Sequence, residues 1–432
     1  MSVVFWMLCG LVFYVYVGYP VLLHVWARFR LAPPKRGGAR AGHGEPSVSI
    51  VIASRNEGGR IPGRLDNLRQ LDYPSHKQQI IVVSDGSTDN TSAVLARIPR
   101  VVAVDQPAGG KARALNAGVA RATNEIVVFG DMRQAFAPDA LRALVAPFRD
   151  PRVGAVSGEL VLNGESRDRR QDDDRRAARD RRAAEDRRDE ARRTPGLRKR
   201  SRRWSGRRAR LESTIADGVG LYWRYEKQIR RDESATGSMV GATGAIYALR
   251  RSLWRPLPPD TILDDVLTPM RCVMAGYRVV FDERACAFDR TAPDASTEAR
   301  RKLRTLAGNY QLLWLEPRLL LPWRNRAWLQ FVSHKVGRLL VPYALPLLLL
   351  LSLLLAHRAP VYAAAFTVQF TFYLLAAYGA WLEHSRHTPP GPLALAVTPV
   401  NRLARVALMF LVMNKSAVAG LVALATKQKV WR

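Results

Sequence analysis

Two nearby stretches of sequence decide the fold: SVSIVIASRNEGGR at residues 47–60 and QQIIVVSDGSTDNTS at residues 78–92. In each stretch an apolar, β-branched run is followed by a polar loop. The runs at residues 48–53 and 80–83 have the length and composition of buried parallel strands. A helix-like span lies between them, so the region predicts a β-α-β unit of an open α/β sheet.

Polar side chains follow both predicted strands at the edge where ligands bind in such sheets. The side chains that we expect at a nucleotide site here are Arg55, Asn56, Glu57, Asp85 and Ser87. Carboxylates and exposed backbone amides suit the base, ribose and diphosphate of a nucleotide. Taken alone, the pattern also fits an ordinary turn in which Ser87 or Thr88 caps a helix.

Two further motifs continue the sheet. GGKARALNAGVARA begins at Gly109 after a predicted strand at residues 101–104, and its Lys111 is a cation suited to a diphosphate. Its glycines allow a ligand to approach the backbone closely, although the same residues also fit a surface helix that begins after two glycines. In EIVVFGDMRQAFAPDALRALV, residues 126–129 predict a strand, with Asp131 at its carboxyl end.

The order and spacing of these motifs resemble the nucleotide-binding half of the inverting family 2 glycosyltransferases, which include cellulose, chitin and hyaluronan synthases. The resemblance implies a GT-A fold, an α/β domain with a mixed, mostly parallel sheet. It also implies a nucleotide-sugar donor, for which a UDP-sugar is expected. The donor-binding half would span residues 47–164, and the acceptor and catalytic half residues 216–315.

The chain departs from this family at the metal-binding motif. Members usually carry Asp-x-Asp, whereas this sequence has Asp131-Met132-Arg133. Either Asp131 holds Mg²⁺ or Mn²⁺ with other ligands, or Arg133 supplies part of the positive charge and binds the donor directly. A third reading has Arg133 paired with a surface acid such as Asp139.

Two acids begin a predicted helix in LPPDTILDDVLTPMRCVMAGYRVVF at residues 257–281, and residues 277–281 at its end predict a strand. Acids at a helix N-terminus are favoured by the helix dipole alone. The place also resembles the family's Glu-Asp motif, whose second acid is the catalytic base. The resemblance therefore implies Asp265 as the base, with Asp264 raising its pKa by like-charge repulsion.

Acceptor-side residues are implied by two weaker resemblances. The glycine-rich stretch at residues 237–254 resembles the family's acceptor side, with Gly241 and Gly244. EARRKLRTLAGNYQLLW stands where processive members carry Gln-x-x-Arg-Trp, matched here by Arg301, Arg304 and Thr305. Arg304 would meet the leaving diphosphate, while Arg301 and Trp314 would lie on the acceptor side. A charged amphipathic helix is the alternative.

Both ends of the 432-residue chain are apolar. Residues 1–30 predict a membrane anchor without a cleavage site, and residues 31–46 a flexible linker. Basic residues follow the anchor, so we expect the N-terminus outside and the catalytic domain in the cytoplasm, at a bacterial-type inner or plasma membrane.

The C-terminal part predicts two kinds of membrane segment. Residues 316–338 mix Trp, Leu and Arg as an interfacial amphipathic helix does, although a core helix of the soluble domain is the alternative. Residues 339–432 form the C-terminal membrane region, with spans at 339–356 and 360–382. A third span at 406–425 contains Asn414 and Lys415, which leaves a crossing or a break at membrane depth open.

The formal charge of +30 has a local source. Residues 165–215 form a low-complexity, Arg-rich insertion, in which residues 165–210 hold 20 basic and 10 acidic side chains. A solvated insertion is the first interpretation, contact with anionic membrane lipids the second and nucleic acid the last, because no RNA-binding motif accompanies it. The three cysteines, Cys9, Cys272 and Cys286, lack metal-site spacing.

Together these features predict a membrane-embedded inverting glycosyltransferase acting on a polysaccharide or lipid-linked acceptor. One alternative is a single-addition transferase that acts on a polyprenyl phosphate or a lipid. An alternative of another class is a catalytically silent membrane scaffold that binds anionic polymer.

Overall fold

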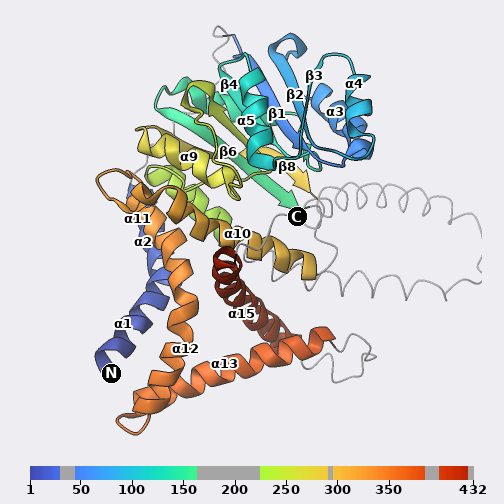
Figure 1. Cartoon of the computed structure of the whole chain (residues 1–432). Coiled ribbons are helices and arrows are strands. Elements are labelled where there is room, and N and C mark those ends of the chain that lie inside the picture. The colour runs from blue at the N-terminus through green and yellow to red at the C-terminus, as the bar shows by residue number, and fades with distance from the viewer. Residues whose placement is uncertain (30–43, 163–223, 290–294, 385–397, 427–432) are drawn as a thin grey trace, which may run out of the picture.

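The computed structural model describes residues 1–29, 44–162, 224–289, 295–384 and 398–426. An α/β domain stands on a group of long helices (Figure 1). The Arg-rich insertion and nearly all of the linker lie outside the described residues.

The domain is built on one eight-stranded sheet of order β3-β2-β1-β4-β7-β6-β8-β5. Its parallel half comprises β1 (Val48–Ser54), β2 (Gln78–Asp85), β3 (Val101–Gln106) and β4 (Ile126–Gly130). The other half is mixed and comprises β5 (Ala135–Phe136), β6 (Val153–Leu162), β7 (Ile246–Arg250) and β8 (Arg278–Asp289). The mixed, mostly parallel sheet is therefore confirmed. The sequence patterns indicated the four parallel strands and part of β8, but not β5, β6 or β7.

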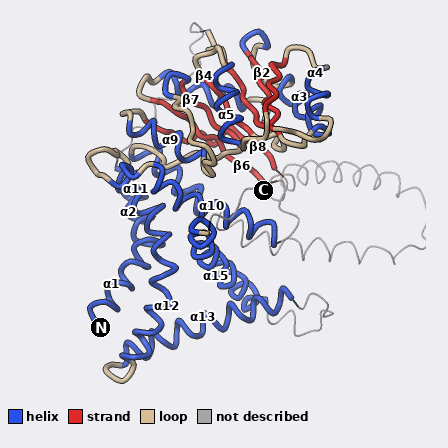
Figure 2. The backbone as a smooth tube through the Cα atoms, viewed as in Figure 1, coloured by secondary structure: helices blue, strands red, loops and turns tan. Residues whose placement is uncertain are grey.

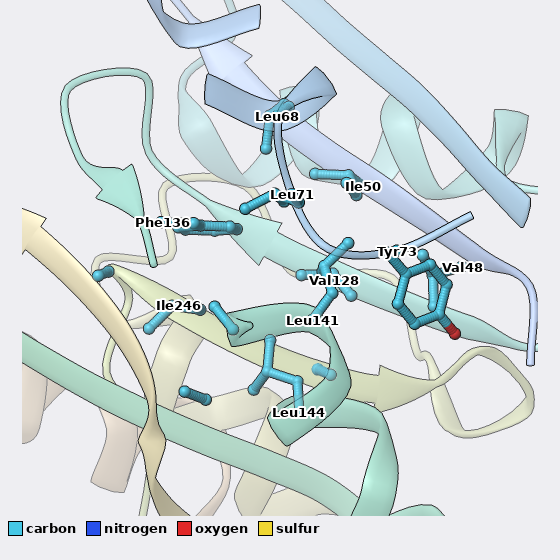
Figure 3. Close-up of a cluster of buried hydrophobic side chains, with 14 of the residues drawn as sticks. Val48, Ile50, Leu68, Leu71, Tyr73, Val128, Phe136, Leu141, Leu144 and Ile246 are labelled. Atoms are coloured by element: carbon cyan, nitrogen blue, oxygen red, sulfur yellow. The ribbon is translucent and has the colours of Figure 1, made fainter. Parts of the chain in front are cut away.

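Helices cover both faces of the sheet. On one face lie α3 (Ile61–Arg69), α4 (Thr91–Ala96) and α6 (Ala140–Val145), and on the other α5 (Lys111–Arg121) and α9 (Asp264–Met274). Within β1, Ile50 and Ile52 pack on the first face and Val51 on the second, as alternating strand residues must. Figure 3 shows the first cluster, where Leu68 and Leu141 meet strand residues such as Val128.

Short helical turns complete the soluble domain. They are η2 (Gly58–Arg60), η3 (Ser75–Lys77), η4 (Ala146–Arg149), η5 (Arg251–Leu253) and η6 (Pro317–Leu320). Residues 224–236 form a further helix, and α10 (Ala295–Leu315) runs between the sheet domain and the long helices (Figure 2).

Four described helical stretches are long and apolar enough to cross a membrane: Ser2–Phe29, Trp328–Leu355, Pro360–Leu382 and Pro399–Ala425. The first consists of α1 (Ser2–Phe13), η1 (Tyr14–Gly18) and α2 (Tyr19–Phe29), and the second of α11 (Trp328–Phe331), η7 (Val332–Val336) and α12 (Gly337–Leu355). The other two belong to α13 (Pro360–His384) and α15 (Thr398–Ala425). Helices of this kind at both ends of the chain confirm the predicted architecture.

Two details of the membrane part concern segments for which the sequence left alternatives open. The second part of the segment expected to be interfacial, from Trp328 on, belongs to a continuous helix that ends at Leu355, and its Phe331 packs in the second buried cluster. In α15 the Asn414 side chain donates to the Phe410 carbonyl at 2.8 Å. The helix therefore continues through Asn414 and Lys415 without a break.

Candidate functional site

A cleft of about 490 Å³ opens at the carboxyl ends of the parallel strands. It is bounded by the ends of β1 and β2, the start of α5, the residue after β4, the loop before α9 and one residue of α10. The residues that line it are Ala53, Ser54, Arg55, Asp85, Ala108, Gly109, Gly110, Lys111, Ala112, Arg113, Asp131, Asp260, Thr261, Ile262 and Arg304. Five residues expected from sequence, Arg55, Asp85, Lys111, Asp131 and Arg304, thus meet in one place.

The loops after β1 and β2 are tied to each other. Asn56 adopts a left-handed backbone with φ of 55°, and its backbone N–H donates to Ser87 Oγ at 3.1 Å. In return Thr88 N–H donates to Asn56 Oδ1 at 2.7 Å. Glu57 is ion-paired with Arg60 at 2.8 Å. Asn56, Glu57 and Ser87 therefore shape the loops beside Arg55, and none of the three lines the cleft.

Asp85 stabilises the turn that precedes α5. Its two carboxylate oxygens accept hydrogen bonds from the backbone N–H groups of Gly109 at 2.7 Å and Gly110 at 2.8 Å. Gly110 has a φ of 87°, a conformation that a side chain would strain. This turn places Lys111, the first residue of α5, in the cleft.

Lys111 lies between two carboxylates. Its Nζ is 3.1 Å from Asp131 Oδ1 and 3.3 Å from Asp264 Oδ1. Burial opposes the charge on Lys111, but Asp131 and Asp264 outweigh burial and raise its pKa. Burial likewise opposes the charge on Asp131, while Lys111 lowers the pKa of that carboxyl. Both groups are therefore charged at neutral pH, and the cleft holds a fixed ammonium.

Asp264 and Asp265 begin α9, as the sequence predicted. Asp264 is buried, and the Tyr247 hydroxyl lies 3.5 Å from its Oδ2. Burial, followed by the charge of Asp264, raises the pKa of Asp265 to about 6. A carboxyl with such a pKa is ionised at neutral pH and remains a stronger proton acceptor than an ordinary aspartate.

The glycine-rich loop expected on the acceptor side packs against this acid. Ala242 N–H donates to the Asp265 carbonyl at 2.7 Å. A Cβ placed on Gly244 would lie 2.9 Å from Asp265 Oδ2, so only glycine allows this approach without a shift. Gly241, in the same loop, packs against Val266.

Arg304 reaches the cleft because α10 is bonded to the loop before α9. Gln311 accepts from Ile262 N–H at 2.9 Å and donates to the Asp260 carbonyl at 2.9 Å. Neither Arg301 nor Trp314 lines the cleft. Trp314 lies ten residues beyond Arg304, about 15 Å along a helix, and is 87% exposed.

Arg133 has a different partner from the one considered at the sequence level. Its Nε lies 3.1 Å from Asp289 Oδ2, not beside Asp139. Asp289 also accepts a hydrogen bond from Gln134 Nε2 at 3.0 Å. Arg133 does not line the cleft, but it is close enough to Asp131 for its charge to help Lys111 keep the pKa of that carboxyl low.

The side chains around Asp131 do not by themselves form a site for a divalent metal. Within the described ranges, no group of three or more His, Cys, Asp and Glu side chains is arranged to hold an ion. Lys111 Nζ already lies at hydrogen-bond distance from Asp131. A hard divalent cation needs several oxygen ligands and would compete with this ammonium for the same oxygen.

Sequence reasoning missed several residues of this region. Arg113, Asp260 and Thr261 line the cleft, and their closeness to Lys111 and Asp264 in the chain was a usable signal. No local sequence signal pointed to Tyr247 of β7 or Arg64 of α3. Both are buried, and they lie near the acids of the site only because their strand and helix pack there.

Two family descriptions match consecutive parts of the chain. "Glycosyl transferase family 2" matches residues 49–215, and "Glycosyl transferase family group 2" matches residues 209–382. The chain belongs to glycosyltransferase family 2. The match includes Asp131 in the first part and Asp264, Asp265 and Arg304 in the second, so the cleft of this family 2 enzyme combines residues from both.

Two curated relatives of this family 2 chain are named as synthases of different kinds of molecule. Beta-monoglucosyldiacylglycerol synthase of Synechocystis is 32% identical over 142 residues, covering 31% of this chain and 30% of the relative. Poly-beta-1,6-N-acetyl-D-glucosamine synthase of Staphylococcus aureus is 33% identical over 124 residues, covering 28% and 30%. The chain thus spans less than a third of each relative's length.

A solved structure matches the family 2 chain along its whole length. Mannosyltransferase PcManGT from Pyrobaculum calidifontis, in complex with GDP-Man and Mn²⁺, has a TM-score of 0.60 at 21% identity. The match covers 99% of this chain and 100% of that one. It confirms the GT-A fold together with its membrane-type helices.

Proposed function

We propose that this protein transfers a sugar, with inversion, from a nucleotide-sugar donor to a hydroxyl of a polysaccharide or lipid-linked acceptor. One observation carries the proposal: Asp265, an acid whose pKa burial and Asp264 raise to about 6, begins α9 beside the cleft that Lys111 and Arg304 line. A proton acceptor and leaving-group cations are the two requirements of inverting transfer.

The donor site would be the cleft, with a UDP-sugar as the expected donor. Its volume of about 490 Å³ suits a small-molecule site. Arg55 and the loops held by Asp85 line the end formed by β1 and β2. The diphosphate would lie near Lys111, at the N-terminus of α5, where the helix dipole also favours an anion.

The reaction would proceed in one displacement. The acceptor oxygen forms a bond to the anomeric carbon while the bond from that carbon to the diphosphate oxygen breaks. Asp265 takes the proton of the acceptor hydroxyl, and the electron pair of the broken bond leaves with the diphosphate. Lys111 and Arg304 stabilise the charge that develops on the leaving group.

The membrane arrangement is part of the proposal. The basic residues after the first helix favour a cytoplasmic catalytic domain, with the N-terminus outside, at a bacterial-type inner or plasma membrane. The cleft would then face the cytoplasmic pool of nucleotide sugars, while the acceptor reaches Asp265 from the side of the membrane helices.

Single addition to a lipid or a polyprenyl phosphate is the second candidate function. One observation favours it over processive synthesis: Thr305 stands where processive members carry a tryptophan, and Trp314 is ten residues beyond Arg304 and 87% exposed. The name of the Synechocystis relative also supports a lipid acceptor.

The test is to incubate membranes containing the full chain with a panel of radiolabelled nucleotide sugars and to size the product. Transfer from one donor, lost in Asp265→Asn, supports the proposal, and a lipid-extractable product of one added sugar supports single addition. If purified protein neither transfers nor hydrolyses any donor, the proposal fails and the membrane-scaffold alternative is favoured.

A further inference from the structure

The arginine that departs from the family's metal motif has a defined place in the structure. Arg133 follows the carboxyl end of β4 by three residues and is ion-paired with Asp289, whose side chain is only 8% exposed. Gln134 donates to the same Asp289 oxygen at 3.0 Å. A buried carboxylate with two partners from one loop orients that loop, so the position of the Arg133 guanidinium is set by the fold.

A guanidinium at this position changes the local charge by a specific amount. Relative to a motif with a second acid, Arg133 replaces a charge of −1 by +1. The difference of two positive charges equals the charge that a divalent cation would bring. In the described part of the chain Asp289 is the one ion-pair partner of Arg133. A guanidinium has five N–H groups, so Arg133 keeps N–H groups that can bind a phosphate.

The other groups around Asp131 are also cationic. Lys111, Arg133 and Arg304 all act to lower the pKa of Asp131, Lys111 most of the three. Arg64 lies close to Gly130, the residue before Asp131. Its side chain is 4% exposed, and a Cβ added to Gly130 would lie 3.1 Å from its Nη2. The Arg64 guanidinium stacks on Phe136 at 4.0 Å, and its Nε and Nη2 have no hydrogen-bond partner among the described atoms.

We propose that this enzyme binds the diphosphate of its donor with the side-chain cations Lys111, Arg133 and Arg304 in place of a divalent metal. The inference rests on the proposed nucleotide-sugar donor and concerns only what neutralises its diphosphate. Arg133 forms bidentate bonds to phosphate oxygens, because a planar guanidinium matches their spacing. Asp131 then positions Lys111 at 3.1 Å and does not ligate an ion.

The experiment measures binding of UDP, with GDP in parallel, to the purified full chain in detergent by calorimetry. Titrations are run in excess EDTA and in millimolar Mn²⁺ or Mg²⁺, with uridine or guanosine as the matched nucleoside. We expect the same Kd for the diphosphate in EDTA and in metal. Arg133→Ala should weaken diphosphate binding about ten- to a hundredfold and leave nucleoside binding unchanged.

Two more variants sharpen the result. Arg133→Asp restores two acids, so its diphosphate binding should become dependent on Mn²⁺ or Mg²⁺. Arg152→Ala is the matched control, because it also removes an arginine that is paired with an aspartate, here the exposed Arg152 with Asp150 at 2.9 Å. Thermal unfolding in detergent checks that each variant is folded.

The failure of this inference differs from failure of the proposed function. If EDTA abolishes diphosphate binding by the parent chain and Mn²⁺ restores it, the metal-free site is wrong while the nucleotide site stands. Equal diphosphate affinities before and after Arg133→Ala would also overturn it. If neither diphosphate binds under any condition, both proposals fail.

Discussion

Two clusters of charged side chains, built from similar groups, behave in opposite ways. In the cleft at the strand ends, Lys111 and Asp131 keep 38% and 34% of their side-chain surface exposed. In the second cluster, at the junction of the helices below the sheet, Glu233 and His334 are 1% and 6% exposed. We call this second group the junction cluster; it consists of Tyr19, Glu226, Glu233, His334 and Arg338.

Every acid of the junction cluster has protein partners. Glu233 accepts from Tyr19 at 3.0 Å and bonds to His334 Nδ1 at 2.7 Å. Glu226 pairs with Arg338 and lies 3.3 Å from His334 Nε2. Burial opposes the charge of Glu226, yet Arg338 and His334 lower its pKa well below the ordinary value. The cluster is electrostatically complete and joins three helices.

The difference shows how one chain uses charge for two purposes. A buried network whose groups are all paired fixes the arrangement of elements, here the first membrane helix, the helix at residues 224–236 and the helix from Trp328. The cleft cluster is half-open, and two of its cations, Lys111 and Arg304, line the cavity. We therefore expect changes in the cleft to alter binding or turnover, and changes at the junction to alter stability first.

The largest effect is expected for Asp265→Asn. The amide keeps the volume but cannot accept the acceptor's proton, so transfer should fall about 100- to 10,000-fold while UDP binding persists. Initial rates and calorimetry on the same preparation measure both. Asp66→Asn, an exposed change on α3, is the control. Retention of more than about a tenth of the activity would remove Asp265 from the role of base.

Glu233→Gln should break the junction cluster. Removing one partner of a buried pair leaves uncompensated charge and costs about 3–5 kcal/mol. We expect a lower unfolding temperature in detergent, with UDP affinity of the folded fraction unchanged. Because Glu233 also accepts from Val240 N–H at 3.4 Å, in the loop before Gly241, turnover should fall as well. A variant that unfolds like the parent would show that the junction is not a stability element.

The pH dependence of turnover should report the raised pKa of Asp265. A base must be ionised, and burial with the charge of Asp264 keeps Asp265 protonated below a pH of about 6. Turnover should therefore decline as pH falls through about 6, by up to tenfold per unit. Asp264→Asn removes the like charge, so its acidic limb should move to lower pH. An unmoved limb would assign the titration to another group.

Replacing residues 166–210 by a short Gly/Ser linker should have the smallest effect. The segment carries the Arg-rich insertion and includes no residue of either cluster. We expect unchanged UDP affinity and unfolding temperature, with weaker association with vesicles that contain anionic lipid. Co-sedimentation with neutral vesicles is the control. A deletion protein that cannot bind UDP would show that the insertion is part of the donor domain.

Local sequence patterns predicted those parts of the molecule that depend on neighbouring residues. Apolar runs of β-branched residues specify β1 to β4, and a polar residue after such a run lies at the edge where the cleft opens. Lys111, Asp131, Asp264, Asp265 and Arg304 each stand at the end of a strand or on a helix that the sequence indicates. Long apolar runs likewise specify the membrane-type helices.

Tertiary structure decided which partners these groups have. Asp85 accepts from the amides of Gly109 and Gly110, more than 20 residues away, and Arg133 meets Asp289 where β5 pairs with β8. Tyr19 reaches Glu233 over 214 positions in the chain. The physical reason is that periodicity and propensity act over a few residues, whereas a pairing between distant side chains exists only after the elements that carry them have packed.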